Sequence, residues 1–209
     1  MKVLGVMGGT FDPIHYGHLV TAEAARQSFG MEQVVFVPAG HPPHKEGKPI
    51  STGQHRYLMT VLATVTNPHF EVSRTEVDRP GPSYAVETIR EFHRRYGEDT
   101  QIYFITGADA ILEICTWYDS RKLLGLCQFI AATRPGYSLE NLDVLQHKLS
   151  PELVRSIHLL EVPALAISSS DIRERVRRHG PIKYLLPEAV EHYIAKSRLY
   201  LDTSANGEA

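Results

Sequence analysis

Short apolar runs recur along the chain and alternate with longer segments of helical spacing. The apolar runs are rich in Val, Ile and Phe, and several are apolar throughout, which is typical of strands buried on both faces of a sheet. They cover residues 2–7, 33–39, 70–74, 101–106, 127–133 and 157–162. Segments with the spacing of helices cover residues 18–30, 51–65, 83–97, 138–149, 169–180 and 187–200. This alternation predicts an α/β fold, a parallel sheet with helices on both faces.

Several helix ends carry local signals. Ser51 and Gln54 have the spacing of a capping box, Ser83 is the expected start of the next helix, and Gly30 and Gly97 are expected stops. The proline-rich stretch 38–49 fits neither element and is expected to be a functional loop. Residues 1–201 are therefore predicted to form one domain, with a C-terminal helical part from about residue 168 and a loose tail at 202–209.

Composition narrows the class of protein. Among 209 residues, Lys and Arg number 22 and Asp and Glu 24, so the formal charge of -2 favours neither a nucleic-acid partner nor a membrane surface. No apolar run approaches the roughly 18 residues of a membrane span. Cys115 and Cys127 have no metal-ligand or redox spacing, which favours a reducing compartment. We therefore expect a cytoplasmic protein.

The first strand-to-helix turn, GGTFDPIHYGHL at residues 8–19, is the strongest candidate site. Gly8 and Gly9 leave the backbone open to a ligand, and the following helix N-terminus suits phosphate. The glycines match neither of the two common phosphate-loop patterns. His15 and His18 lie on one helix face. They could instead hold a metal, with Asp12 the only further ligand at hand, or be ordinary histidines.

This stretch resembles the H-x-G-H signature of the nucleotidyltransferases related to class I aminoacyl-tRNA synthetases. The resemblance implies a Rossmann-like fold of the nucleotidyltransferase type and transfer of an adenylyl group from ATP. It implies catalytic roles for His15 and His18, and ATP binding by Gly8, Gly9, Thr10, Phe11 and His18.

A second signature of that superfamily is expected far along the chain, and ISSSDIR at residues 167–173 resembles it. The resemblance implies ATP binding by Ser168, Ser169, Ser170 and Arg173, with Arg173 also catalytic. Taken alone, the segment could be a well-capped surface helix with a basic face. The chemistry needs no covalent nucleophile, because an acceptor phosphate can attack directly in line. Mg²⁺ is expected to be held mainly by the nucleotide phosphates, so no metal ligands are assigned.

The middle of the chain resembles bacterial nicotinate mononucleotide adenylyltransferases in PPHK at 42–45, SYAVET at 83–88, GADAILEICTW at 107–117 and RPG at 134–136. Ala85 and Ser170 depart from the family, where threonine is usual. Gly107 and Asp109 are expected to bind ATP, and Trp117 could stack on a pyridine ring or be a core aromatic. The residues expected to bind the mononucleotide are His44, Lys45, Tyr84, Thr88, Trp117 and Arg134.

The expected substrates are ATP and nicotinate mononucleotide, and the products are nicotinate adenine dinucleotide and pyrophosphate in NAD biosynthesis. Nicotinamide mononucleotide is an alternative acceptor, and a non-catalytic nucleotide sensor is an alternative from another class. Neither nucleic acid nor a membrane is expected as a partner, and a homo-oligomer is left open.

Overall fold

The computed structural model describes residues 2–45, 47, 49–133, 151–163 and 165–201. The predicted helix at 138–149, the predicted tail at 202–209 and Arg134 lie outside the described residues. Of His44, the structure describes the backbone only.

Six parallel strands form one sheet in the order β3-β2-β1-β4-β5-β6. Every predicted strand is confirmed. The central strands are apolar runs buried from both sides, whereas the two edge strands are only partly buried. This strand order is that of the doubly wound Rossmann type, in which ligands bind where the order reverses, here between β1 and β4. The strands are β1 (Val3–Gly9), β2 (Gln33–Pro38), β3 (Phe70–Val72), β4 (Gln101–Gly107), β5 (Gln128–Thr133) and β6 (Ile157–Glu161).

Each face of the sheet has its own apolar core. Leu4 and Val6 of β1 contribute to one, while Met7 and the alternate residues Val34 and Phe36 of β2 contribute to the other. The first core is covered by α3 (Ala85–Tyr96), α4 (Ala108–Leu112), α5 (Ser120–Leu126) and α7 (Pro151–Arg155). The second is covered by α1 (Tyr16–Ser28), α2 (Gly53–Thr64), α8 (Ser169–Arg177) and α9 (Glu188–Lys196). Helices on both faces confirm the predicted fold class.

Helix starts differ from the prediction at two places. Thr52, not Ser51, caps α2, since its side chain accepts a hydrogen bond from the amide of His55 at 3.3 Å. Ser83 does not cap α3. Its hydroxyl accepts from the amide of His41 at 3.1 Å, and Tyr84 precedes the first turn. Both serines bond instead to loops distant in sequence, which local spacing cannot reveal.

Four short helical segments were not predicted, because none is long enough to show a periodicity. They are α4, α5 and the single 3₁₀ turns η1 (Pro43–Lys45) and η2 (Ile114–Thr116). The turn η1 lies in the proline-rich stretch expected to be a functional loop. Helix α7 follows residues outside the described part and was also not predicted.

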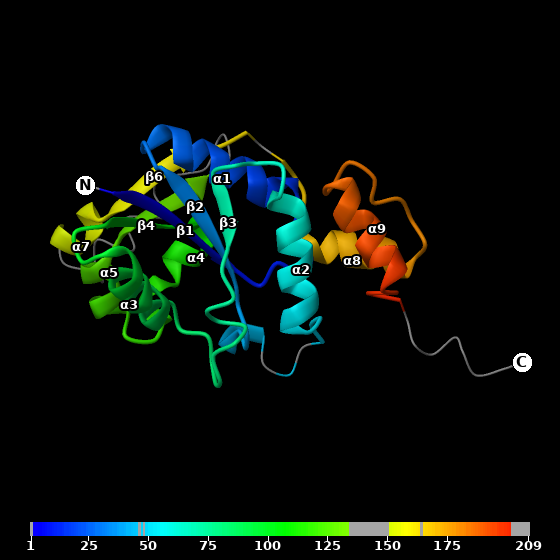
Figure 1. Cartoon of the computed structure of the whole chain (residues 1–209), viewed down its shortest axis with the longest axis horizontal. Coiled ribbons are helices and arrows are strands. Elements are labelled where there is room, and N and C mark those ends of the chain that lie inside the picture. The colour runs from blue at the N-terminus through cyan, green and yellow to red at the C-terminus, as the bar shows by residue number, and fades with distance from the viewer. Residues whose placement is uncertain (1, 46, 48, 134–150, 164, 202–209) are drawn as a thin grey trace, which may run out of the picture.

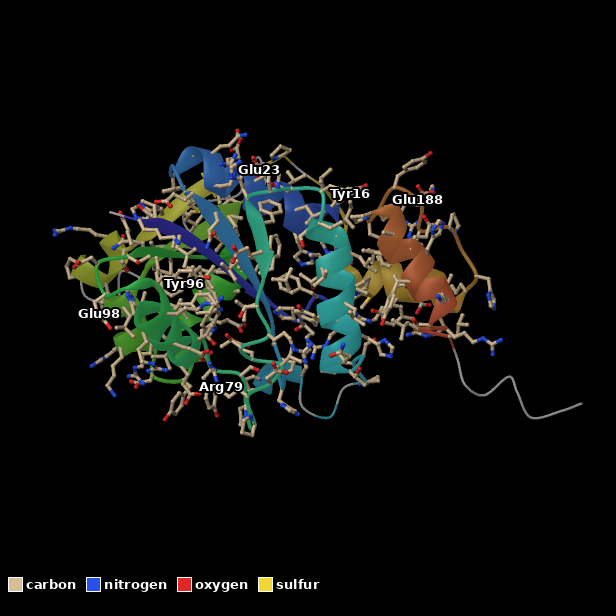
Figure 2. All side chains as sticks on the ribbon, in the orientation of Figure 1. Tyr16, Glu23, Arg79, Tyr96, Glu98 and Glu188 are labelled. Atoms are coloured by element: carbon tan, nitrogen blue, oxygen red, sulfur yellow. The ribbon has the colours of Figure 1, made fainter. Side chains whose placement is uncertain are left out.

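The C-terminal helices dock against the start of the chain. Figure 1 shows α8 and α9 beyond α2 at one end of the molecule, with α3, α5 and α7 at the other. Figure 2 labels Tyr16 at the start of α1 and Glu188 at the start of α9. The Tyr16 amide donates to the Leu185 carbonyl at 3.1 Å, and the Ser169 hydroxyl donates to the Pro13 carbonyl at 2.8 Å. These contacts bring the two signature segments together.

Candidate active site

Three hollows meet at the carboxyl ends of β1 and β4, where the strand order reverses. The β5 hollow, of 590 Å³, is lined by His15, His18, Thr106, Gly107, Asp109 and Thr133 among others. The α3 hollow, of 550 Å³, is lined by Gly8, Gly9, Thr10, Lys45, Tyr84, Thr106 and Trp117 among others. The α8 hollow, of 330 Å³, is lined by Thr10, Phe11, His18, Lys45, Ser169, Ser170 and Arg173 among others. Because each pair of hollows shares lining residues, the three are contiguous.

The two histidines lie face to face at the start of α1. His15 precedes the first turn, and its amide donates to Nδ1 of His18 at 3.2 Å. Since Nδ1 of His18 accepts a hydrogen bond, the proton of the neutral ring is on Nε2, which can donate to a ligand. The ring centroids are 3.8 Å apart. A Cβ at Gly17 would lie 3.0 Å from the His15 ring, so this packing requires a glycine or a shift of the ring.

Burial keeps both imidazoles neutral. Desolvation lowers the pKa of His15 to about 4. Desolvation, and then repulsion from His15, lowers the pKa of His18 to about 3. Both are therefore neutral hydrogen-bond donors near neutral pH rather than fixed cations. The Nδ1 atom of His15 is buried and has no hydrogen-bond partner within the described residues.

Arg173 points from α8 back to the first loop. One of its amino groups donates to the Asp12 carbonyl at 2.7 Å and the other to the Ser170 hydroxyl at 3.2 Å. Ser170 and Ser169 line the α8 hollow with it. Ser168, by contrast, caps α8 by accepting from the amide of Asp171 at 3.1 Å. The N-terminus of α8 therefore faces the hollow with the Ser170 hydroxyl and the Arg173 guanidinium, a set suited to phosphate, whereas the Ser169 hydroxyl donates its hydrogen to the Pro13 carbonyl.

Gly8 and Gly9 line the α3 hollow rather than the side that carries the histidines. A Cβ at Gly8 would lie 2.8 Å from the Phe104 ring, and one at Gly9 would lie 2.8 Å from the Phe11 ring. Phe11 is buried and packs edge-on to His18, with centroids 5.1 Å apart. The glycines are therefore needed for packing as well as for access to the backbone.

The predicted mononucleotide residues divide into two groups. Trp117 is half-buried, packs edge-on against Phe104 with centroids 5.8 Å apart and also lines the α3 hollow, so it is both a core aromatic and part of the wall. Tyr84 and Lys45 line the same hollow. Thr88 is buried behind the wall, where its hydroxyl donates to Oε1 of Glu76 at 2.6 Å. Thr88 is not among the residues that line the hollow, whereas its partner Glu76 is.

Wall residues that the sequence did not identify include Tyr118 and Glu76. Tyr118 lines the α3 hollow and stacks on Tyr84, with centroids 4.3 Å apart. Glu76 lines it as a buried carboxyl, and desolvation raises its pKa against the hydrogen bonds from Thr88 and Ser83. Tyr118 directly follows the predicted Trp117, which is a signal. Glu76 lies in a loop without any recognisable pattern.

A family model described as cytidylyltransferase-like matches residues 6–175. The chain belongs to this family. The resemblance inferred from the motifs is thus confirmed, and the protein is a nucleotidyltransferase.

Curated relatives of this nucleotidyltransferase carry a more specific name. A protein of Moorella thermoacetica named "probable nicotinate-nucleotide adenylyltransferase" is 62% identical over 94% of this chain and 91% of its own. One of the same name from Thermoanaerobacter sp. is 58% identical over 98% and 97%. The fold also matches a solved structure, the Plasmodium falciparum nicotinic acid mononucleotide adenylyltransferase complexed with NaAD. The TM-score is 0.71 at 22% identity, over 96% of this chain and 98% of that one.

Within the described ranges, the nucleotidyltransferase has no group of three His, Cys, Asp or Glu side chains placed to hold a metal ion. Both carboxylate oxygens of Asp12 already accept hydrogen bonds, from the Ser51 amide and the Tyr200 hydroxyl. No helix in the described part of the chain is long and apolar enough to cross a membrane.

Proposed function

We propose that this nucleotidyltransferase joins ATP to nicotinate mononucleotide, forming nicotinate adenine dinucleotide and pyrophosphate in NAD biosynthesis. The observation that carries the proposal is the contiguity of the three hollows around Thr10 and His18. One long nucleotide and a second, shorter one fit such an arrangement with their phosphates meeting at the centre. The names of the relatives support the same reaction.

Each hollow suits one part of the substrates. The β5 hollow would take the adenosine of ATP, where the Asp109 carboxylate can accept from a ribose hydroxyl. The α8 hollow would take the β- and γ-phosphates, near Arg173 and the start of α8. The α3 hollow would take the mononucleotide, with its pyridine ring on Trp117 and its phosphate towards Lys45. Lys45 lines both the α3 and α8 hollows, so it lies where the reacting phosphates would meet.

The reaction would be a direct displacement. An oxygen of the mononucleotide phosphate attacks the α-phosphorus, the bond from that phosphorus to the bridging oxygen breaks, and pyrophosphate leaves. His18 would donate from Nε2 to the phosphate oxygens, while Arg173 would offset negative charge on the leaving group. Catalysis is then mainly positioning and electrostatic stabilisation.

The catalytic metal is proposed to be Mg²⁺ bound by ATP. Mg²⁺ commonly keeps several waters and binds through substrate phosphates rather than through a cage of protein ligands. When bound, Mg²⁺ would neutralise phosphate charge and assist departure of pyrophosphate.

The acceptor is decided by measuring pyrophosphate release from ATP and Mg²⁺ with nicotinate mononucleotide and, separately, nicotinamide mononucleotide, with the dinucleotide confirmed by mass. We expect faster turnover with the acid. Faster turnover with nicotinamide mononucleotide would make that compound the acceptor and leave adenylyl transfer as the reaction. ATP binding without turnover of either mononucleotide would refute adenylyltransferase activity and favour a non-catalytic nucleotide sensor.

Three further properties belong to this proposal. Residues 1–201 are proposed to form one domain, which is supported by the core that α8 and α9 share with β1 and β2. A cytoplasmic location is supported by the free thiols of Cys115 and Cys127. Sedimentation of the purified chain would decide between a monomer and a homo-oligomer.

A further inference from the structure

Among the described residues, Arg56 on α2 is the largest side chain that is fully buried. Its three nitrogen atoms donate to three backbone carbonyls: Nε to Ser51 at 2.9 Å, Nη1 to Thr10 at 2.9 Å and Nη2 to Gly40 at 3.0 Å. A buried cation is costly unless it is hydrogen-bonded, and here backbone oxygens accept from three of the five N–H groups. Asp12 and Glu76 add negative charge nearby.

The three carbonyls belong to three loops that bound the hollows. Thr10 lines both the α3 and α8 hollows. Gly40 follows Ala39, which lines the α3 hollow. Ser51 follows Ile50, which lines the α8 hollow. Arg56 itself lines none of the three, so it would not touch substrate.

The loops of Gly40 and Ser51 also contact residues that line the hollows. A Cβ at Gly40 would lie 2.0 Å from the carbonyl oxygen of Glu76, so the 39–41 loop presses directly on the wall of the α3 hollow. The Ser51 amide donates to the carboxylate of Asp12 at 3.2 Å, and the Asp12 carbonyl accepts from Arg173 at 2.7 Å. Arg56 thus acts on both the acceptor side and the phosphate side.

We propose that Arg56 is a positioning residue that holds the acceptor hollow and the phosphate hollow at the separation that in-line attack requires. The inference rests on the proposed adenylyl transfer. The reacting atoms must approach to about 3–3.5 Å with aligned orbitals, and a displacement of about 1 Å can cost about 10²-fold in rate. Because Arg56 lines none of the hollows, we expect each hollow taken singly to keep its lining when Arg56 is altered. The relative position of the hollows is what depends on the guanidinium.

Lysine is the informative replacement. It keeps the positive charge and the helix propensity, but its single ammonium cannot reproduce a planar fork that reaches three loops in different directions. In Arg56→Lys we expect kcat to fall about 10- to 100-fold. The dissociation constants of ATP alone and of nicotinate mononucleotide alone, measured by calorimetry, should each change less than about threefold.

A merely structural role would lower the fraction of folded protein without changing turnover per competent site. The kcat is therefore expressed per ATP-binding site counted in the same calorimetric titration. Arg26→Lys is the matched control, since Arg26 lies on α1 in a half-buried ion pair with Glu23 at 2.7 Å, outside the hollows. It should retain wild-type kcat.

The following results would overturn the positioning role or the proposed function. Wild-type kcat per site in folded Arg56→Lys overturns the positioning role, and so does loss of either single-substrate affinity in proportion to kcat. If Arg56→Lys does not fold, Arg56→Gln, which buries no charge, is judged by the same criteria. Failure of both to fold overturns the proposal in favour of a folding role. Absence of turnover in the wild type would instead refute the proposed function.

Discussion

Lowering the pH from 8 to about 5 should destabilise the folded protein through His15 and His18. Burial lowers their pKa values to about 4 and about 3, from 6.5 in the unfolded chain. Between those values the unfolded chain binds protons that the folded chain does not, so the free energy of unfolding falls as the pH drops below 6.5. At pH 5, which is 1.5 units below the pKa of the unfolded chain, each imidazole should lower the free energy of unfolding by about 2 kcal/mol, because one pKa unit corresponds to about 1.36 kcal/mol. The pair should cost about 4 kcal/mol.

The assay is urea unfolding at pH 8, 7, 6 and 5. Other groups titrate over this range, so the test quantity is the difference in pH dependence between the wild type and His15→Gln/His18→Gln. The double variant should lose about 4 kcal/mol less than the wild type between pH 8 and 5. His69→Gln, at an exposed position outside the hollows, controls for the loss of an imidazole. A difference below about 1 kcal/mol, less than the cost of one such imidazole, would refute the reasoning.

Further variants address the site directly. His18→Ala should lower kcat at least about 10²-fold with the fold retained, as expected for loss of a charge-stabilising donor, and near-full activity would contradict its phosphate contact. Trp117→Ala should raise the KM of the mononucleotide more than that of ATP, whereas equal increases would favour a purely structural aromatic. Tyr200→Phe removes the hydroxyl that donates to Asp12 at 2.7 Å, so the free energy of unfolding in urea should fall by about 1–3 kcal/mol. An unchanged denaturation midpoint would mean that this bond contributes nothing.

Local pattern in the chain was enough for most of the architecture. The six strands can be predicted because each is a short, mostly apolar run, and the central ones are buried from both sides. The long helices can be predicted because their apolar residues repeat at helical spacing. The two signature segments can be recognised from the sequence because the residues within each segment are close together along the chain. The helices of five to seven residues, α4, α5 and α7, are too short to show any such spacing.

Sequence alone indicated the fold class and the family and located the two signature segments, since all three depend on residues near one another along the chain. Only the tertiary structure decided how those residues are held. It turned Thr88 away to Glu76, placed Gly8 and Gly9 in the α3 hollow and buried Arg56 beneath three loops. The reason is that a polar side chain takes the partner that folding brings to it. The Tyr200 hydroxyl finds Asp12 across 188 positions, a distance at which sequence periodicity carries no information.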